Sequence, residues 1–224
     1  MAHYEVEIKS LLGAKERADE IKNKMQELDS DCKLISTNAQ LNHYFEGGDI
    51  KELFSKTKHL FAPELLSKFE KIVAEGSDFS VRTRQRDDEV LLVVKASVDG
   101  GTSFNTVTRL EFEEPVAISL DELDQLVQSA GYVYQAKWSR QREEFTYKGA
   151  NVCFDKNAGY GYLAEFEKIV DSSDELELVR TELDALMTEL GVEELSQDRL
   201  ARMFDFYNQN WPEYYGTDKV FEIE

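Results

Sequence analysis

Charged side chains recur along this chain at a spacing of two residues, and this pattern limits the folds that the chain can adopt. Because successive side chains of a strand point to opposite faces, charges at positions i and i+2 lie on one face. The opposite face of such a segment is apolar, as Val6 and Ile8 illustrate. Lys95 is the single charge on an otherwise apolar segment, and the other groups are Glu5/Glu7/Lys9, Arg82/Arg84/Arg86, Arg109/Glu111/Glu113, Arg140/Arg142 and Glu165/Glu167.

Two arrangements of these faces are open at this point. In the first, the charged faces are solvated, which is common in antiparallel sheets and adds little stability. In the second, helices cover the apolar faces and the sheet closes into a barrel, which removes its exposed edges. Charges inside a barrel require water or an ion-rich ligand. Clustered Arg and Lys suit phosphate oxygens, and clustered carboxylates suit Mg²⁺ or Mn²⁺, so this arrangement predicts a site for a metal–polyphosphate complex.

Hydrophobic periodicity predicts an α+β chain with about eight strands and helices between them. Short connections favour antiparallel pairing. Ser119 with Glu122 predicts a capping box, and Gly131 the end of that helix. The expected strands are 3–10, 32–46, 79–86, 89–97, 103–114, 132–148, 150–156 and 161–170, and the expected helices start near residues 14, 49, 63, 120, 174 and 196.

Composition excludes several classes of function. Asp and Glu number 45 against 26 Lys and Arg, and the net charge of −19 disfavours binding to nucleic acid. No apolar run approaches the roughly 20 residues that a membrane span needs, and the first ten residues lack a signal core. Cys32 and Cys153 form no CxxC pair, so we expect a reduced, cytoplasmic protein. We find no boundary that divides the chain into two cores.

The charged groups, taken in order, resemble a known family. Residues 5–9, E-V-E-I-K, resemble the ExExK signature of the CYTH superfamily, the triphosphate tunnel metalloenzymes. The later groups resemble its R-x-R, R-x-E-x-E, K-x-R and closing E-x-E elements, with Asp155 and Gly161 before the last of them. There are two departures: Asn42 replaces an acid in Q-x-D-x-Y-F, and Arg140 replaces Lys.

The resemblance implies a closed eight-stranded antiparallel tunnel with a charged interior and helices outside. It places this domain at residues 1–170, with a helical insertion at about 47–78 and a helical extension at 171–224. It implies a small triphosphate substrate and Mg²⁺ or Mn²⁺. We expect a monomer or homodimer without membrane or duplex nucleic-acid partners. The family's activities leave two functions open, hydrolysis of a triphosphate and adenylate cyclase chemistry. A third possibility, from another class of protein, is polyphosphate or nucleotide binding without turnover.

The resemblance also suggests roles for the charged residues other than Arg86, which we expect to be a rim or solvent-exposed charge. Glu5, Glu7, Glu165 and Glu167 are assigned to one divalent metal, and Glu111 and Glu113 to a second ion or its waters. Asp155 is open to two roles, as a metal ligand or as a partner that holds an Arg or Lys. The cations assigned to binding the triphosphate are Lys9, Arg82, Arg84, Lys95, Arg109, Arg140 and Arg142.

Overall fold

The structure, a computed structural model, describes residues 4–97, 109–170 and 172–223. Its strands form one antiparallel sheet in the order β1-β8-β7-β6-β2-β3-β4-β5, so the α+β prediction with eight strands is confirmed. The strands are β1 (Tyr4–Gly13), β2 (Lys33–Gly47), β3 (Ser77–Arg86), β4 (Glu89–Ser97), β5 (Arg109–Val116), β6 (Tyr132–Tyr147), β7 (Ala150–Asn157) and β8 (Gly161–Val170). The α-helices are α1 (Lys15–Leu28), α2 (Ile50–Thr57), α3 (Pro63–Glu75), α4 (Leu120–Ser129), α5 (Leu176–Leu190) and α6 (Gln197–Asn210).

The expected closed tunnel requires hydrogen bonds between the two end strands of the sheet. The strand order ends at β1 and β5, and no hydrogen-bonded ladder joins these two strands within the described ranges. The strand expected from residue 103 begins at Arg109 in the described part of the chain, and residues 103–108 lie outside it. The eight strands and their pairing thus agree with the expected fold, without closure by hydrogen bonds.

The described residues gather into two compact units, which the sequence did not predict. Unit 1 comprises the described residues within Met1–Ala39 and Ser139–Glu224, and unit 2 comprises those within Gln40–Trp138. The long strands β2 and β6 each contribute residues to both units. Because continuous strands join the two units, the chain has no Gly- or Pro-rich linker at these points. The sequence therefore shows no boundary.

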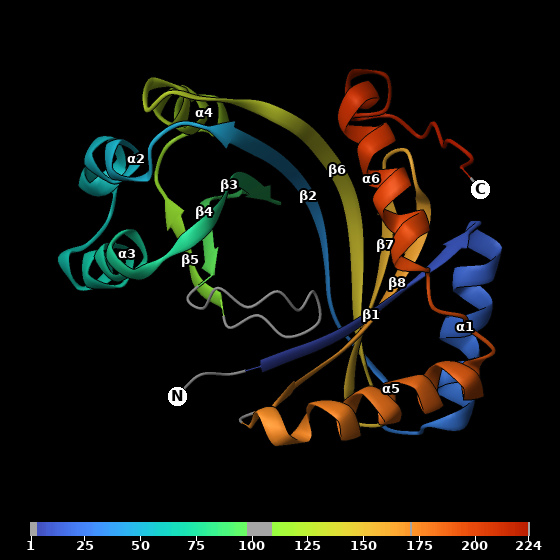
Figure 1. The fold of residues 1–224 in the computed structure, drawn as a ribbon. Helices are drawn as coiled ribbons and strands as arrows, with labels where there is room; N and C mark the ends of the chain where they lie inside the picture. Colours follow the sequence, from blue (N-terminus) through green and yellow to red (C-terminus); the bar gives the residue numbers. More distant parts are fainter. Residues whose placement is uncertain (1–3, 98–108, 171, 224) are drawn as a thin grey trace. The chain divides into compact units, whose positions relative to one another are not determined.

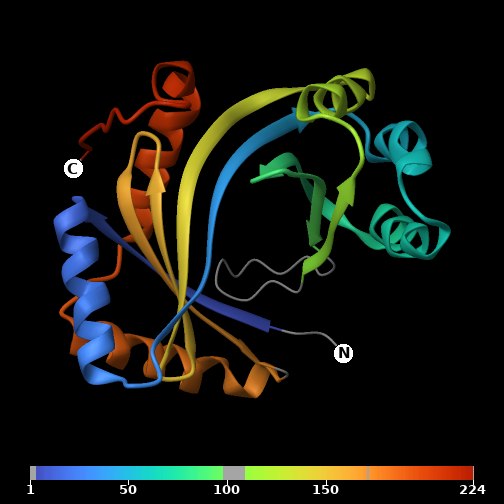
Figure 2. The ribbon, with the colours of Figure 1, turned by 180° about the vertical axis from the view of Figure 1, so that it is seen from behind.

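In unit 1, helices cover one face of the strands. Ile8, Phe154 and Phe166 belong to a buried cluster that also includes Ile21 of α1 and Leu183 of α5. Figures 1 and 2 show α1 and α5 beside β1 and β8, and direct contacts join these elements. Since side chains alternate, the residues between these apolar positions lie on the other face, which carries the predicted charges.

Unit 2 has its own core, built by the helices α2, α3 and α4. Phe69 of α3 stacks on Phe112 of β5 with ring centroids 4.5 Å apart, and Leu53 and Leu92 are buried with them. Figure 1 shows α2 and α3 close together in the chain between β2 and β3, within the expected insertion at 47–78.

The predicted helix ends in unit 2 are confirmed. Ser119 caps α4 in a capping box, in which the Glu122 amide donates to Ser119 Oγ and the Glu122 carboxylate accepts from the Ser119 amide at 2.9 Å. Gly131 follows α4 with a φ of +86°, a conformation that glycine adopts at little cost. Asp49 caps α2 by accepting from the amides of Lys51 and Glu52.

Candidate functional site: two charged clusters

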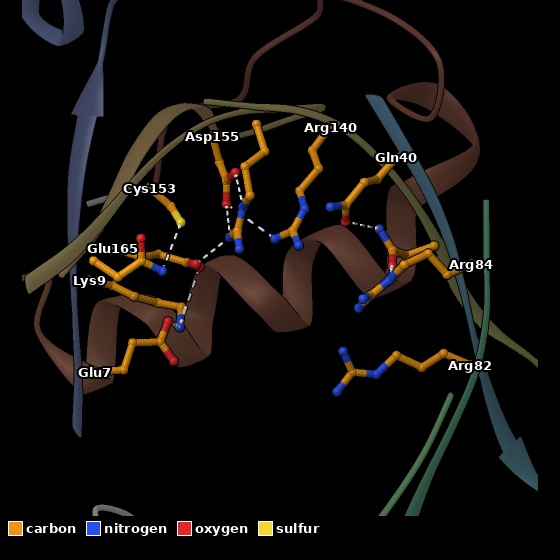
Figure 3. Close-up of polar contacts among 12 residues, drawn as sticks. Glu7, Lys9, Gln40, Arg82, Arg84, Arg140, Cys153, Asp155 and Glu165 are labelled. Atoms are coloured by element: carbon orange, nitrogen blue, oxygen red, sulfur yellow. Dashed lines mark hydrogen bonds and ion pairs between the residues drawn. The ribbon is translucent and has the colours of Figure 1, made fainter. Parts of the chain in front are cut away.

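In unit 1, the carboxylates of β1 and β8 lie side by side. The antiparallel register places Glu7 opposite Glu167 and Lys9 opposite Glu165. The Lys9 ammonium forms ion pairs with the carboxylates of Glu7 and, at 3.5 Å, of Glu165 (Figure 3). The sequence alternation therefore brings these four predicted residues to one face. Glu5 lies one position further along this face of β1, but its side chain is outside what the structure describes.

Strand β7 adds a fully buried carboxylate to the same unit. Asp155 accepts from Arg142 Nε at 2.7 Å and from Arg142 Nη2 at 2.5 Å, a bidentate pair. It also accepts from Arg140 Nη1 at 3.1 Å (Figure 3). Arg142 donates in addition to Glu165. Asp155 thus holds both arginines, which is one of the two roles that its position in the sequence left open.

The ion-paired part of this cluster is electrically balanced. Three cations, Lys9, Arg140 and Arg142, face three carboxylates, Glu7, Glu165 and Asp155. We call these six residues the unit 1 cluster. Burying charge is costly unless each charge is paired, and this pairing meets that requirement.

The pKa shifts within the unit 1 cluster follow from the same contacts. Burial alone raises the pKa of Glu165, but attraction by Lys9, Arg142 and Arg140 outweighs it and holds the pKa well below its usual range. Burial alone lowers the pKa of Lys9, but Glu165 and Glu7 raise it overall. Lys9 and Glu165 therefore both stay charged at neutral pH.

In unit 2, Arg84 of β3 is held by neighbours on both sides. Arg84 Nε donates to Asn42 Oδ1 at 2.7 Å, and Arg84 Nη1 donates to Glu113 at 2.8 Å. Asn42 in turn donates to Gln40 at 3.4 Å. Where the family pattern has an acid, Asn42 supplies an acceptor oxygen that carries no negative charge. Asn42 therefore does not neutralise the positive charge of Arg84.

Arg82, two residues away, has different partners. Its Nη1 donates to the Tyr44 hydroxyl at 3.1 Å, and its guanidinium lies 4.6 Å from the centre of the Tyr44 ring. Its Nε donates to Ser80 at 3.4 Å. Among the residues that the structure describes, Arg82 has no carboxylate partner. A half-buried guanidinium with neutral partners attracts an anion more strongly than one that is already ion-paired.

The remaining predicted residues of unit 2 lie on β4 and β5. Lys95 pairs with Glu111 at 2.9 Å across the two strands. Arg109 occupies the start of β5, but its side chain is outside the described part. We call Arg82, Arg84, Lys95, Glu111 and Glu113 the unit 2 cluster.

The thirteen predicted site residues therefore divide between the units. Gln40 has no predicted role, although it lies two residues before Asn42 on β2 and therefore shares its face. Unit 1 carries Glu5, Glu7, Lys9, Arg140, Arg142, Glu165 and Glu167, and unit 2 carries Arg82, Arg84, Lys95, Arg109, Glu111 and Glu113.

The acidic side chains of unit 1 meet part of what a divalent cation needs. Glu7, Glu165 and Glu167 offer the hard oxygen donors that Mg²⁺ and Mn²⁺ prefer, on two paired strands. Their donor chemistry fits such an ion. Within the described residues, however, no three His, Cys, Asp or Glu side chains converge as a ready coordination shell. Glu7 and Glu165 are instead engaged by Lys9 and Arg142.

Comparison with known proteins identifies the family. The CYTH domain matches residues 70–201, which is more than half of the chain. The chain belongs to the CYTH domain family. The matched range contains most of the charged strands described above, from Arg82 to Glu167. No curated protein sequence matches this CYTH protein.

Solved structures share the fold of this CYTH protein at low sequence identity. A candidate adenylate cyclase from Vibrio parahaemolyticus is 15% identical with a TM-score of 0.59, over 92% of this chain and 99% of that one. The PH1819 protein from Pyrococcus horikoshii OT3 is 23% identical with a TM-score of 0.58, over 91% of this chain and 99% of that one. The PH1012 protein of the same organism is 17% identical with a TM-score of 0.56, over 84% and 91%. In the described part of the chain, no helix is both long and apolar enough to cross a membrane.

Proposed function

We propose that this CYTH protein is a metal-dependent triphosphatase that hydrolyses inorganic tripolyphosphate or a small organic triphosphate. The observation that most supports this is the charged face of its strands. Guanidinium groups there are already oriented, by Asp155 in the unit 1 cluster and by Asn42, Glu113 and Tyr44 in the unit 2 cluster. Phosphoryl transfer depends mainly on such positioning and on neutralising charge.

The cations would bind the substrate. Arg82 offers the strongest initial attraction because its partners are neutral, and Arg84 adds a second guanidinium on the same strand. Planar guanidinium groups match phosphate oxygens in bidentate pairs. Lys9, Lys95, Arg109, Arg140 and Arg142 complete the proposed set.

The acids would hold Mg²⁺ or Mn²⁺, with Glu5, Glu7, Glu165 and Glu167 at one ion and Glu111 and Glu113 near a second ion or its waters. A bound divalent ion supplies an activated water and neutralises phosphate charge. Lys9 and Arg142 now neutralise Glu165. When these cations turn to phosphate oxygens, Glu165 becomes available as a ligand, so substrate and metal would replace the internal ion pairs together.

The experiment is a substrate panel: tripolyphosphate, thiamine triphosphate, ATP and GTP, each with Mg²⁺ or Mn²⁺, with orthophosphate release measured. We expect release that EDTA abolishes. Arg82→Gln should lower it strongly. Arg86→Gln, on the same strand, should lower it much less, because Arg86 pairs with Glu89 at 2.6 Å and approaches Glu113 of the unit 2 cluster only at 4.0 Å. No release from any triphosphate, with EDTA making no difference, would contradict the proposal.

Adenylate cyclase chemistry is the second candidate, because a structural neighbour from Vibrio parahaemolyticus carries that description. The same cations would bind ATP, with the ribose hydroxyl attacking the α-phosphorus. Cyclic nucleotide with pyrophosphate among the products of ATP would favour it, whereas ADP with phosphate favours hydrolysis. Tight binding without any product would favour a binding protein. A cytoplasmic location and a monomeric or homodimeric state remain predictions.

A further inference from the structure

A buried carboxylate lies behind β3, the strand that carries Arg82 and Arg84, and the proposed function does not use it. Asp124 belongs to α4 and is only 2% exposed. It lies on the buried side of that helix with Leu123 and Val127, where an apolar residue would ordinarily be found. A polar group at such a position requires partners.

Asp124 has three partners, each from a different strand. Thr83 of β3 donates to Oδ1 at 2.5 Å, and Tyr134 of β6 donates to Oδ2 at 2.5 Å. His43 Nδ1 of β2 lies 2.7 Å from Oδ2. Burial alone raises the pKa of Asp124, but the hydrogen bonds from His43, Thr83 and Tyr134 lower it overall, so the group is a carboxylate at neutral pH.

The register of β2 and β3 connects this carboxylate to the charged face. His43 pairs directly with Thr83, and both contact Asp124. The flanking pairs are Asn42 with Arg84 and Tyr44 with Arg82. Because side chains alternate along a strand, Asp124 holds the central pair from one face while the two flanking pairs lie on the other.

We propose that Asp124 is a positioning residue for Arg82 and Arg84. By holding His43 and Thr83 together, it fixes β2 against β3 at the point where each guanidinium meets its neighbour on β2. Two of those contacts are the Arg84 Nε bond to Asn42 at 2.7 Å and the Arg82 Nη1 bond to Tyr44 at 3.1 Å. Phosphate binding by the two arginines rests on the proposed function. Their orientation by Asp124 does not depend on that function.

Small displacements of such groups have large effects, because a guanidinium that is misplaced by about 1 Å no longer meets two phosphate oxygens. Thr83 and Tyr134 provide a matched test. Both hydroxyls donate to Asp124 at the same distance, but Thr83 lies between Arg82 and Arg84, whereas Tyr134 lies on a different strand.

The experiment compares Thr83→Val, which keeps the shape and removes the hydroxyl, with Tyr134→Phe, which keeps the ring and removes the hydroxyl. Both should lose similar thermal stability. Calorimetric titration with tripolyphosphate in EDTA should show roughly tenfold weaker binding for Thr83→Val and unchanged binding for Tyr134→Phe. Thr83→Ser restores the hydroxyl and should restore binding, although the missing methyl group lowers stability.

A second readout needs no ligand. The Arg84 Nε–H signal in ¹⁵N-resolved spectra, assigned by its loss in Arg84→Lys, should move in Thr83→Val and stay in place in Tyr134→Phe and Thr83→Ser. If the wild-type protein does not bind tripolyphosphate in EDTA, this signal alone decides the inference. The proposed function is decided separately, by orthophosphate release in the presence of Mg²⁺ or Mn²⁺. Two results would show that Asp124 only stabilises the fold. One is an Arg84 signal that does not move in Thr83→Val, and the other is a tripolyphosphate affinity that falls in proportion to the loss of thermal stability in all three variants.

Discussion

The sharpest prediction concerns Asp155, which joins the two arginines of unit 1. Asp155→Asn keeps the shape of the side chain but removes its charge and replaces one acceptor oxygen with an NH₂ group. Arg142 uses both oxygens of Asp155 and Arg140 uses one, so the amide nitrogen must face at least one guanidinium donor. Because Asp155 is fully buried, water cannot replace the lost acceptor oxygen.

The expected cost follows from that geometry. Breaking a buried, hydrogen-bonded ion pair by removing one partner costs about 3–5 kcal/mol. For a chain of this length each kcal/mol lowers the melting temperature by about 2–4 °C, so we expect a fall of about 6–20 °C. Thermal and urea unfolding, followed by circular dichroism, measure both quantities.

A matched control lies in the same unit. Asp218 pairs with Lys156 at 2.5 Å, but its side chain is 86% exposed. Asp218→Asn should therefore cost under about 1 kcal/mol. Raising the salt concentration should reduce that small effect and leave the effect at Asp155 nearly unchanged. If both variants lose the same small stability, our reading of Asp155 as the residue that holds Arg140 and Arg142 is wrong.

Three further predictions follow from particular contacts. In EDTA, Arg82→Gln should weaken tripolyphosphate binding by on the order of tenfold, and Arg142→Gln by less, as measured by calorimetry below each melting temperature. The lowered pKa of Asp124 contributes stability above the ordinary pKa of an aspartate, near 3.8, that is lost as the pH falls through its lower folded value. Urea unfolding between pH 6 and pH 3 should therefore be less pH-dependent in Asp124→Asn than in the wild type. Cys153 is 2% exposed, and burial raises its pKa to about 12, so iodoacetamide at pH 8 should label it only after unfolding, as mass spectrometry would show.

Much of the fold and of the face that carries the candidate site could be predicted from the sequence because a strand has a fixed period. The alternation of residues 5–9 and 165–167 predicts which side chains share a face, and the structure places Glu7 opposite Glu167 and Lys9 opposite Glu165. Helix ends were also predictable, because capping depends on neighbouring residues alone, as Ser119 shows.

What the sequence did not predict depends on contacts between distant segments. The role of Asp155 follows from its register with Arg142, which sequence spacing does not fix. The two units were missed because β2 and β6 pass through both without a break in their strand pattern. Asp124 left a weak signal, a carboxylate within the apolar stripe of α4, but its partners on three strands are visible only in the structure.

The two charged clusters differ in a way that bears on how a substrate would bind. In the unit 1 cluster, each cation is matched by a carboxylate, so a phosphate that takes Arg142 leaves Glu165 and Asp155 with one partner fewer in a buried setting. In the unit 2 cluster, Arg82 can bind phosphate without leaving any described carboxylate unpaired. Affinity without metal should therefore come first from Arg82. A divalent ion would compensate the carboxylates of unit 1 and make its cations available, which gives a physical reason why a triphosphatase of this construction would need the ion.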